Sequence, residues 1–156
     1  MRVCLGADHR GYALKERLKV RLAEEGFTIE DKGAFAEDPG DDYPDFALPV
    51  ARAVAANPEA RGILLCGSGM GMDVVANKVR GVRATVGYSL ESVVHARSHD
   101  DINVITLAAD ILSEEEAARF AGAFLSTAFD EAERNVRRLE KIARVEEAEN
   151  LGPAPA

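Results

Sequence analysis

The chain has 156 residues, of which 47% are hydrophobic and 29% charged, and its formal net charge is −8 at pH 7. These values fit one globular domain and disfavour nucleic acid as a partner, because phosphate backbones need a basic surface, although a few local cations can still hold a small anion. No apolar run approaches the roughly 18 residues of a membrane span, and both cysteines lie in apolar runs, so we expect a cytoplasmic protein with no membrane partner.

Strands and helices are expected to alternate along the whole chain. Apolar runs predict the strands, and apolar stripes at helical spacing together with capping signals predict the helices. The expected strands are 2–6, 27–31, 62–66, 83–87 and 103–107, and the expected helices are 11–25, 43–56, 72–78, 90–98, 113–126 and 130–149. This order predicts a Rossmann-like α/β fold, a three-layer αβα sandwich around a five-stranded parallel sheet. We expect one domain at residues 1–150, followed by a flexible tail at 151–156.

The segment 66–71 (CGSGMG) joins a buried strand to a helix, at the sheet edge where ligands bind in such folds. Its glycines allow a sharp turn that brings backbone N–H groups close to a ligand, and the positive end of the next helix points to the same place. The pattern indicates a site for an anion or a developing oxyanion, with Cys66 favoured as a thiolate at its rim. The alternative is a tight turn beside a buried structural cysteine.

Three familiar loops do not fit this segment. A dinucleotide fingerprint needs its third glycine one residue later than Gly71, and a Walker loop needs Lys and then Ser or Thr where Met72 and Asp73 stand. A thiol phosphatase loop needs an arginine at the position of Met72. A nicotinamide cofactor, a nucleotide and phosphate-ester hydrolysis through Cys66 are therefore disfavoured.

The histidines offer weaker candidates. Asp8 and His9 directly follow the first strand and either line the same sheet edge or form a surface turn. His99 ends a helix before the fifth strand, where it is either functional or only a C-terminal cap. His95 lies one turn earlier and is interpreted as structural. No tight spacing of ligand residues supports a metal site, so we expect no metal.

The last helix carries two arginines that share one face, Arg134 and Arg138. They could clamp a phosphate, but the acidic residues around them fit a solvated, salt-bridged surface equally well.

Four segments together resemble one known family. They are G-A-D-H-R-G-Y-x-L-K at 6–15, D-Y-P at 42–44, G-I-L-L-C-G-S-G-M-G-M-x-x-x-A-N-K-x-x-G-x-R-A at 62–84 and H-x-D-x-N-V at 99–104. Over roughly residues 2–142 the chain is similar to the type B ribose-5-phosphate isomerase family, which also includes the galactose-6-phosphate isomerase subunits. The resemblance implies an aldose–ketose isomerase without metal or cofactor, which transfers a proton between C1 and C2 through a cis-enediolate. It also implies a homodimer or tetramer whose subunits share active sites, with the C-terminal helix extending to a partner subunit.

The resemblance assigns expected roles to individual residues. Cys66 matches the proton-transferring base of one branch of the family, whereas the other branch uses a glutamate where this chain has Met72. His99 matches the residue that opens the sugar ring, and Ser68 matches one that assists at the reacting oxygens. The other expected substrate contacts are Asp8, His9 (towards the phosphate), Tyr43, the loop residues Gly67, Gly69, Met70 and Gly71, Asn77, Asp100, Arg134 and Arg138. Arg134 and Arg138 match the arginine pair of the family only if one residue is inserted before the last helix. Without that insertion Arg137 takes the second position and Glu133 the first.

Several positions depart from the family pattern. Asp100 stands where the family has Asn, so an amide that donates and accepts hydrogen bonds becomes an acceptor-only carboxylate. Asp110 replaces an arginine that helps to bind phosphate, and we expect Arg10 to compensate for its charge. Asp73 replaces a usual serine. The residues for ring opening and proton transfer are retained, whereas the phosphate and hydroxyl contacts are altered.

The sequence therefore predicts isomerisation of ribose 5-phosphate to ribulose 5-phosphate. The first alternative is the same chemistry on a hexose 6-phosphate, a tetrulose phosphate or another pentose phosphate, because Asp100 and Asp110 are altered. A non-catalytic subunit is disfavoured by the retained Cys66 and His99, and a nucleotide-binding module by the misplaced third glycine.

Overall fold

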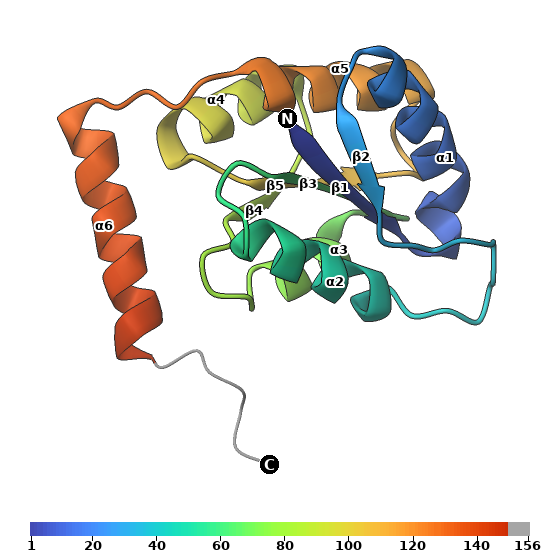
Figure 1. Cartoon of the computed structure of the whole chain (residues 1–156), viewed down its shortest axis with the longest axis horizontal. Helices are drawn as coiled ribbons and strands as arrows, with labels where there is room; N and C mark the ends of the chain where they lie inside the picture. Colours follow the sequence, from blue (N-terminus) through green and yellow to red (C-terminus); the bar gives the residue numbers. More distant parts are fainter. Residues whose placement is uncertain (150–156) are drawn as a thin grey trace.

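Five parallel strands form the centre of the computed structural model, which describes residues 1–149 (Figure 1). The strands are β1 (Arg2–Ala7), β2 (Thr28–Asp31), β3 (Arg61–Cys66), β4 (Ala84–Val86) and β5 (Val104–Ala108). The helices are α1 (His9–Glu24), α2 (Pro44–Ala55), α3 (Met70–Ala76), α4 (Leu90–Asp100), α5 (Glu114–Ser126) and α6 (Glu133–Ala148). The sheet has the order β2-β1-β3-β5-β4, which confirms the predicted α/β fold. The expected tail at 151–156 lies outside the described residues.

Helices cover the sheet on both faces and give the protein two apolar cores. Helices α1, α4 and α5 pack on one face, where Ile63 and Leu65 of β3 meet residues such as Phe124. Helices α2 and α3 pack on the other face, against Leu64 and Cys66. Side chains alternate along a strand, so the continuous apolar run of β3 fills both cores. None of the helices within residues 1–149 is long and apolar enough to cross a membrane.

Local hydrogen bonds decide where several helices begin and end. Helix α1 begins two residues earlier than predicted, because the Asp8 carboxylate accepts a hydrogen bond from the Gly11 N–H and caps the first turn. Gly26 follows the end of α1 with a φ of 89°, the left-handed conformation that commonly ends a helix. A capping box of Ser113 and Glu116 opens α5.

Helix α6 belongs to neither apolar core of the sheet (Figure 1). It contacts α4, and its Glu146 carboxylate accepts a hydrogen bond from the Gly81 N–H at 3.0 Å. It begins three residues later than predicted, because the Asp130 carboxylate accepts the Ala132 N–H at 3.0 Å and holds this stretch in a turn. Among its described residues only Asn135 is buried, whereas the exposed large apolar side chains are Val136, Ile142 and Val145. The expectation that α6 extends to a partner subunit stays a prediction.

Candidate active site

The carboxyl ends of β1, β3 and β5 meet at one edge of the sheet. In the strand register Ala7 pairs with Leu65 and Cys66 pairs with Ala108, so the residues that follow these strands lie side by side. The Ala109 N–H donates to the Cys66 carbonyl at 2.8 Å, which holds the end of β5 against the glycine loop. A hollow of about 310 Å³ opens at this edge, and we call it the Cys66 hollow; it is lined by Asp8, Arg10, Tyr43, Cys66, Gly67, Ser68, Gly71 and Asp110.

Cys66 lies at the end of β3 and is only 5% exposed. Its Sγ accepts a hydrogen bond from the Gly69 N–H at 3.1 Å. Gly69 has a φ of 77°, a left-handed conformation that favours glycine and lets the loop fold back towards the sulfur. Further along the loop the Met70 N–H donates to Ser68 Oγ at 3.3 Å. An N–H aimed at the sulfur stabilises negative charge that develops there during a reaction.

The second cysteine is chemically different. Cys4 in β1 is completely buried, and its thiol donates to the Glu30 carboxylate at 3.7 Å. Burial raises the pKa of Cys4 to about 11, and the nearby Glu30 adds to this effect. Cys4 therefore stays a thiol at neutral pH, which makes Cys66 the cysteine available for chemistry.

An ion pair between Arg10 and Asp110 closes one side of the Cys66 hollow. Arg10 Nε donates to Asp110 Oδ2 at 3.0 Å, and Nη2 donates to the same oxygen at 2.5 Å. A Cβ atom on Gly67 would lie 2.6 Å from Arg10 Nε, so a side chain at this position would displace the pair. The pair agrees with the expectation that Arg10 compensates for the charge of Asp110.

Asp8 and His9 follow β1, but their side chains face different surroundings. Asp8 lines the hollow and is 6% exposed, and burial raises the pKa of its carboxyl group. His9 turns to the loop before α2, where its Nδ1 lies 2.7 Å from Asp41 Oδ1 and its backbone N–H donates to the same oxygen at 3.1 Å. This hydrogen bond raises the pKa of His9. Sequence reasoning missed Asp41, whose signal is limited to its place in an acidic run before Tyr43.

The structure places Tyr43 in the Cys66 hollow but leaves Asn77 outside its lining. Two ring carbons of Tyr43 would lie 2.8 Å from a Cβ atom on Gly71, so the ring packs directly on the glycine loop. The Asn77 amide donates to the carbonyls of Asp73 and Ala84 at 3.1 Å each and accepts the Ala84 N–H at 2.9 Å. These bonds fasten β4 to the end of α3.

His99 and Asp100 lie on the side of the sheet where the strands begin, whereas Cys66 lies on the side where they end. They belong to the last turn of α4, which ends just before β5 begins at Val104. Val104 pairs with Gly62, near the start of β3. Cys66 is four residues farther along this strand, a distance of about 13 Å at roughly 3.3 Å per residue. Within one chain, the structure therefore does not bring His99 to Cys66.

The arginines of α6 lie on the same side as His99. The stretch before α6 is fixed to the end of α4 by the Asp130 N–H, which donates to the Ser98 carbonyl at 2.7 Å. Arg134 and Arg138 are exposed and make no ion pair with other described residues, whereas Arg137 lies 3.8 Å from Glu133. The expected phosphate contact through Arg134 and Arg138 stays a prediction.

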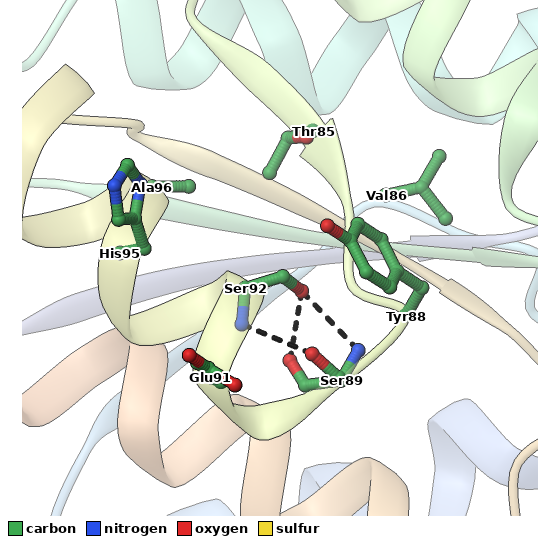
Figure 2. Close-up of a pocket in the computed structure, with 8 residues that line it drawn as sticks. All are labelled: Thr85, Val86, Tyr88, Ser89, Glu91, Ser92, His95 and Ala96. Carbon is green, nitrogen blue, oxygen red and sulfur yellow. Dashed lines mark hydrogen bonds between the residues drawn. The ribbon is translucent and has the colours of Figure 1, made fainter.

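A groove of about 530 Å³ lies between β4 and α4. Figure 2 shows the residues that line it. We call it the β4–α4 groove, and it is lined by Thr85, Val86, Tyr88, Ser89, Glu91, Ser92, His95 and Ala96. His95 also contacts His99, whose Nδ1 lies 2.9 Å from His95 Nε2 with the two rings almost perpendicular. The contact agrees with the spacing of one helical turn between the two histidines, and the interpretation of His95 as structural stays a prediction. No group of three or more His, Cys, Asp or Glu side chains suited to a metal ion occurs in the described part of the chain.

Comparison with known proteins gives a consistent result. Residues 3–142 match the model of a family described as Ribose/Galactose Isomerase. The ribose-5-phosphate isomerase B of Mycolicibacterium paratuberculosis is 37% identical over 155 residues, which are 99% of this chain and 98% of that protein. The crystal structure of ribose-5-phosphate isomerase B from Mycoplasma genitalium with bound ribulose-5-phosphate matches with a TM-score of 0.90 and 37% identity, over 94% of this chain and 96% of that one. The type B ribose 5-phosphate isomerase of Trypanosoma cruzi also has a TM-score of 0.90 and 37% identity, over 95% and 99% of the two chains.

Proposed function

Since the chain belongs to the ribose/galactose isomerase family, we propose that it interconverts ribose 5-phosphate and ribulose 5-phosphate. The observation that carries this proposal is the position of Cys66, at a hollow on the ligand-binding edge of the sheet and inside a glycine loop whose N–H reaches the sulfur. The relative from Mycoplasma genitalium binds ribulose-5-phosphate, which is the proposed product, and supports this choice of substrate.

In the proposed mechanism Cys66 transfers the proton. Its thiolate removes the proton from C2 of the open-chain aldose, and the electron pair forms the C1–C2 double bond of a cis-enediolate. The same thiol returns the proton to C1, while a hydroxyl proton moves from O2 to O1 and the ketose results. Ser68 assists at these oxygens. Backbone N–H groups of the loop stabilise the enediolate. The N–H groups of Gly69 and Met70, which donate to Cys66 Sγ and Ser68 Oγ in the free protein, donate to the enediolate oxygens instead.

We infer that His99, which opens the sugar ring, reaches Cys66 from a second copy of the chain. One chain holds the two residues at opposite edges of its sheet, with Cys66 paired to the end of β5 and His99 placed before its start. A two-fold axis beside α4 would place two chains antiparallel, with each His99 near the partner's Cys66. Such an interface is isologous and completes both sites at once.

The surface beside β4 supports a homodimer. Tyr88 at the mouth of the β4–α4 groove is 79% exposed, and large apolar side chains along α4 and α6 are also exposed: Leu90, Val94, Val136, Ile142 and Val145. Figure 1 shows β4, α4 and α6 on the same side of the molecule. Apolar surface of this kind is stabilised when a partner covers it.

Substitution of each cysteine in turn tests both the isomerase activity and the assignment of Cys66 as the base, with Cys4 as the control. Purified wild-type protein should convert ribose 5-phosphate to ribulose 5-phosphate, and Cys66→Ser should lower kcat by roughly 10²- to 10⁴-fold through loss of the base. Cys4→Ser should remain active, since Cys4 is buried in β1 and is not part of the lining of the hollow. An inactive wild type would refute the isomerase, and a fully active Cys66→Ser would remove Cys66 from the mechanism.

The Arg10–Asp110 pair favours a second candidate, the same chemistry on another sugar phosphate. It places a neutralised ion pair at the hollow where the family has an arginine for phosphate, so a differently shaped substrate could fit best. Measuring kcat/KM for ribose 5-phosphate, a hexose 6-phosphate, a tetrulose phosphate and other pentose phosphates decides between them. We expect the highest value for ribose 5-phosphate, and a higher value for any other sugar would replace it.

A further inference from the structure

Two histidines on α4 form a direct side-chain pair. Nδ1 of His99 lies 2.9 Å from Nε2 of His95, the ring centroids are 4.1 Å apart, and the ring planes meet at 89°. A hydrogen bond between neutral imidazoles needs an N–H on one ring and a lone pair on the other. The pair therefore couples the tautomers of the two rings and limits the rotation of both.

We propose that His95 is a positioning residue for His99. In this arrangement the Nδ1–H of His99 donates to Nε2 of His95, which leaves the lone pair on Nε2 of His99 facing outward for the substrate. The proposal rests on the proposed function, in which His99 opens the sugar ring. There, Nε2 accepts the proton of the anomeric hydroxyl and returns it to the ring oxygen, while the bond between C1 and the ring oxygen breaks and C1=O forms.

Within residues 1–149, the His99 ring depends on His95 for its orientation. The backbone at the end of α4 is fixed, because Asp101 has a φ of 46° and its carboxylate pairs with Arg97 and, at 2.6 Å, with Arg83. The His99 side chain itself is partly exposed, and His95 is its one hydrogen-bond partner within residues 1–149. Without His95 the ring could rotate freely on a rigid helix, and misplacement of an acid–base group lowers its rate contribution.

The substitutions His95→Ala and His95→Gln distinguish a positioning role of His95 from a general structural role. Gln places its Oε1 near the position of histidine Nε2 and can still accept from Nδ1–H of His99, whereas Ala cannot. We expect His95→Ala to lower kcat for ribose 5-phosphate about tenfold with little change in KM, less than the roughly 10²- to 10⁴-fold cost of losing an acid–base group. His95→Gln should restore most of the rate. Glu24→Ala, which changes an exposed residue of α1 away from the β4–α4 groove, should match the wild type.

A nitrogen-15 NMR spectrum gives a readout that a purely structural role would not move. The chain contains three histidines, so the ring signals of His99 can be assigned from single variants. Wild type and His95→Gln should show His99 with its proton on Nδ1, and His95→Ala should show a mixture of tautomers. An active His95→Ala, a failed rescue by Gln or an unchanged tautomer would overturn the proposal. Loss of oligomers in both variants would instead assign His95 to the interface. An inactive wild type would refute the proposed function, while the tautomer comparison would still test the contact.

Discussion

At the scale of single residues, the His9–Asp41 pair gives a prediction about pH. The hydrogen bond from Asp41 raises the pKa of His9, so His9 keeps its positive charge to higher pH than an ordinary histidine, whose pKa is about 6.5. If His9 contacts the substrate phosphate, KM should stay low below the raised pKa and increase as the pH rises through it. Asp41→Asn removes the carboxylate charge, so the increase in KM should move to lower pH. KM for ribose 5-phosphate measured from about pH 6 to pH 9 checks this shift.

The neighbouring Asp42 provides the control for this shift. Asp42→Asn removes the same charge from an exposed position that makes no hydrogen bond to His9. Its KM profile should follow that of the wild type, because Asp42 does not contact His9. A shift of the same size in both variants would instead indicate a general effect of surface charge. Coincident profiles for wild type and Asp41→Asn would show that His9 charge does not contribute to phosphate binding.

Residues with a strong local pattern could be predicted from the sequence, and residues defined by a distant partner could not. Cys66 stands between a continuous apolar strand and a glycine loop, so its position at the ligand-binding edge follows from the strand itself. Asp41 acts through His9, which is 32 residues away, and nothing near Asp41 signals this contact. The pair of Arg10 and Asp110 spans 100 residues and could be anticipated only by comparing both positions with a family pattern.

At the scale of elements, Asn77 holds the edge strand β4 to α3. Its side-chain amide makes three hydrogen bonds to backbone groups, two of them to Ala84 at the start of β4. Three hydrogen bonds at roughly 0.5–1.5 kcal/mol each would contribute about 1.5–4.5 kcal/mol, and exposure of Asn77 to water reduces this sum, so Asn77→Ala should lower the free energy of unfolding by about 1–3 kcal/mol. Urea unfolding measures this loss. We expect a smaller loss for Asn57→Ala, because Asn57 accepts one bond within its own turn, from the Glu59 N–H.

The Asn77 variant also tests the substrate contact expected from the family resemblance. A structural role predicts reduced stability with KM almost unchanged below the unfolding transition. An unchanged unfolding midpoint combined with a higher KM would assign Asn77 directly to the substrate.

The order and type of the elements could be predicted because each one carries its own periodicity and stop signals. Residues 62–66 are uninterrupted apolar, and Ser113 with Glu116 opens α5 through bonds within four residues. The start of α6 could not be predicted in the same way. A charged stretch from 130 is compatible with a helix, but two contacts of Asp130 delay the first turn: its carboxylate accepts the Ala132 N–H, and its own N–H donates to the Ser98 carbonyl of α4. Tertiary contacts overrode local propensity at that point.

At the scale of the whole molecule, the candidate site is divided between two edges of one sheet. The family resemblance predicts catalytic roles for both Cys66 and His99. Their separation within one chain depends on the direction of α4 relative to β3, which only the folded structure shows. In a parallel sheet all strands end on the same side. Each helix carries the chain back to the start of the next strand, so the helices end on the opposite side. A single chain therefore offers a Cys66 hollow at one edge and His99, Asp100 and the α6 arginines towards the other.

This division predicts that two inactive variants restore activity when they assemble together. Cys66→Ser and His99→Ala should each be nearly inactive as purified homodimers. In a mixed dimer, however, Cys66 of one chain meets His99 of the other, and this single site has both residues intact. Random assembly of equal amounts makes half of the dimers mixed, each with one working site of two, so refolding or co-expressing the variants should recover about a quarter of wild-type activity. Two preparations mixed without chain exchange serve as the control and should stay inactive. If the mixed dimers form, as shown by distinct affinity tags, and yet remain inactive, each site draws both residues from one chain and the antiparallel dimer is wrong.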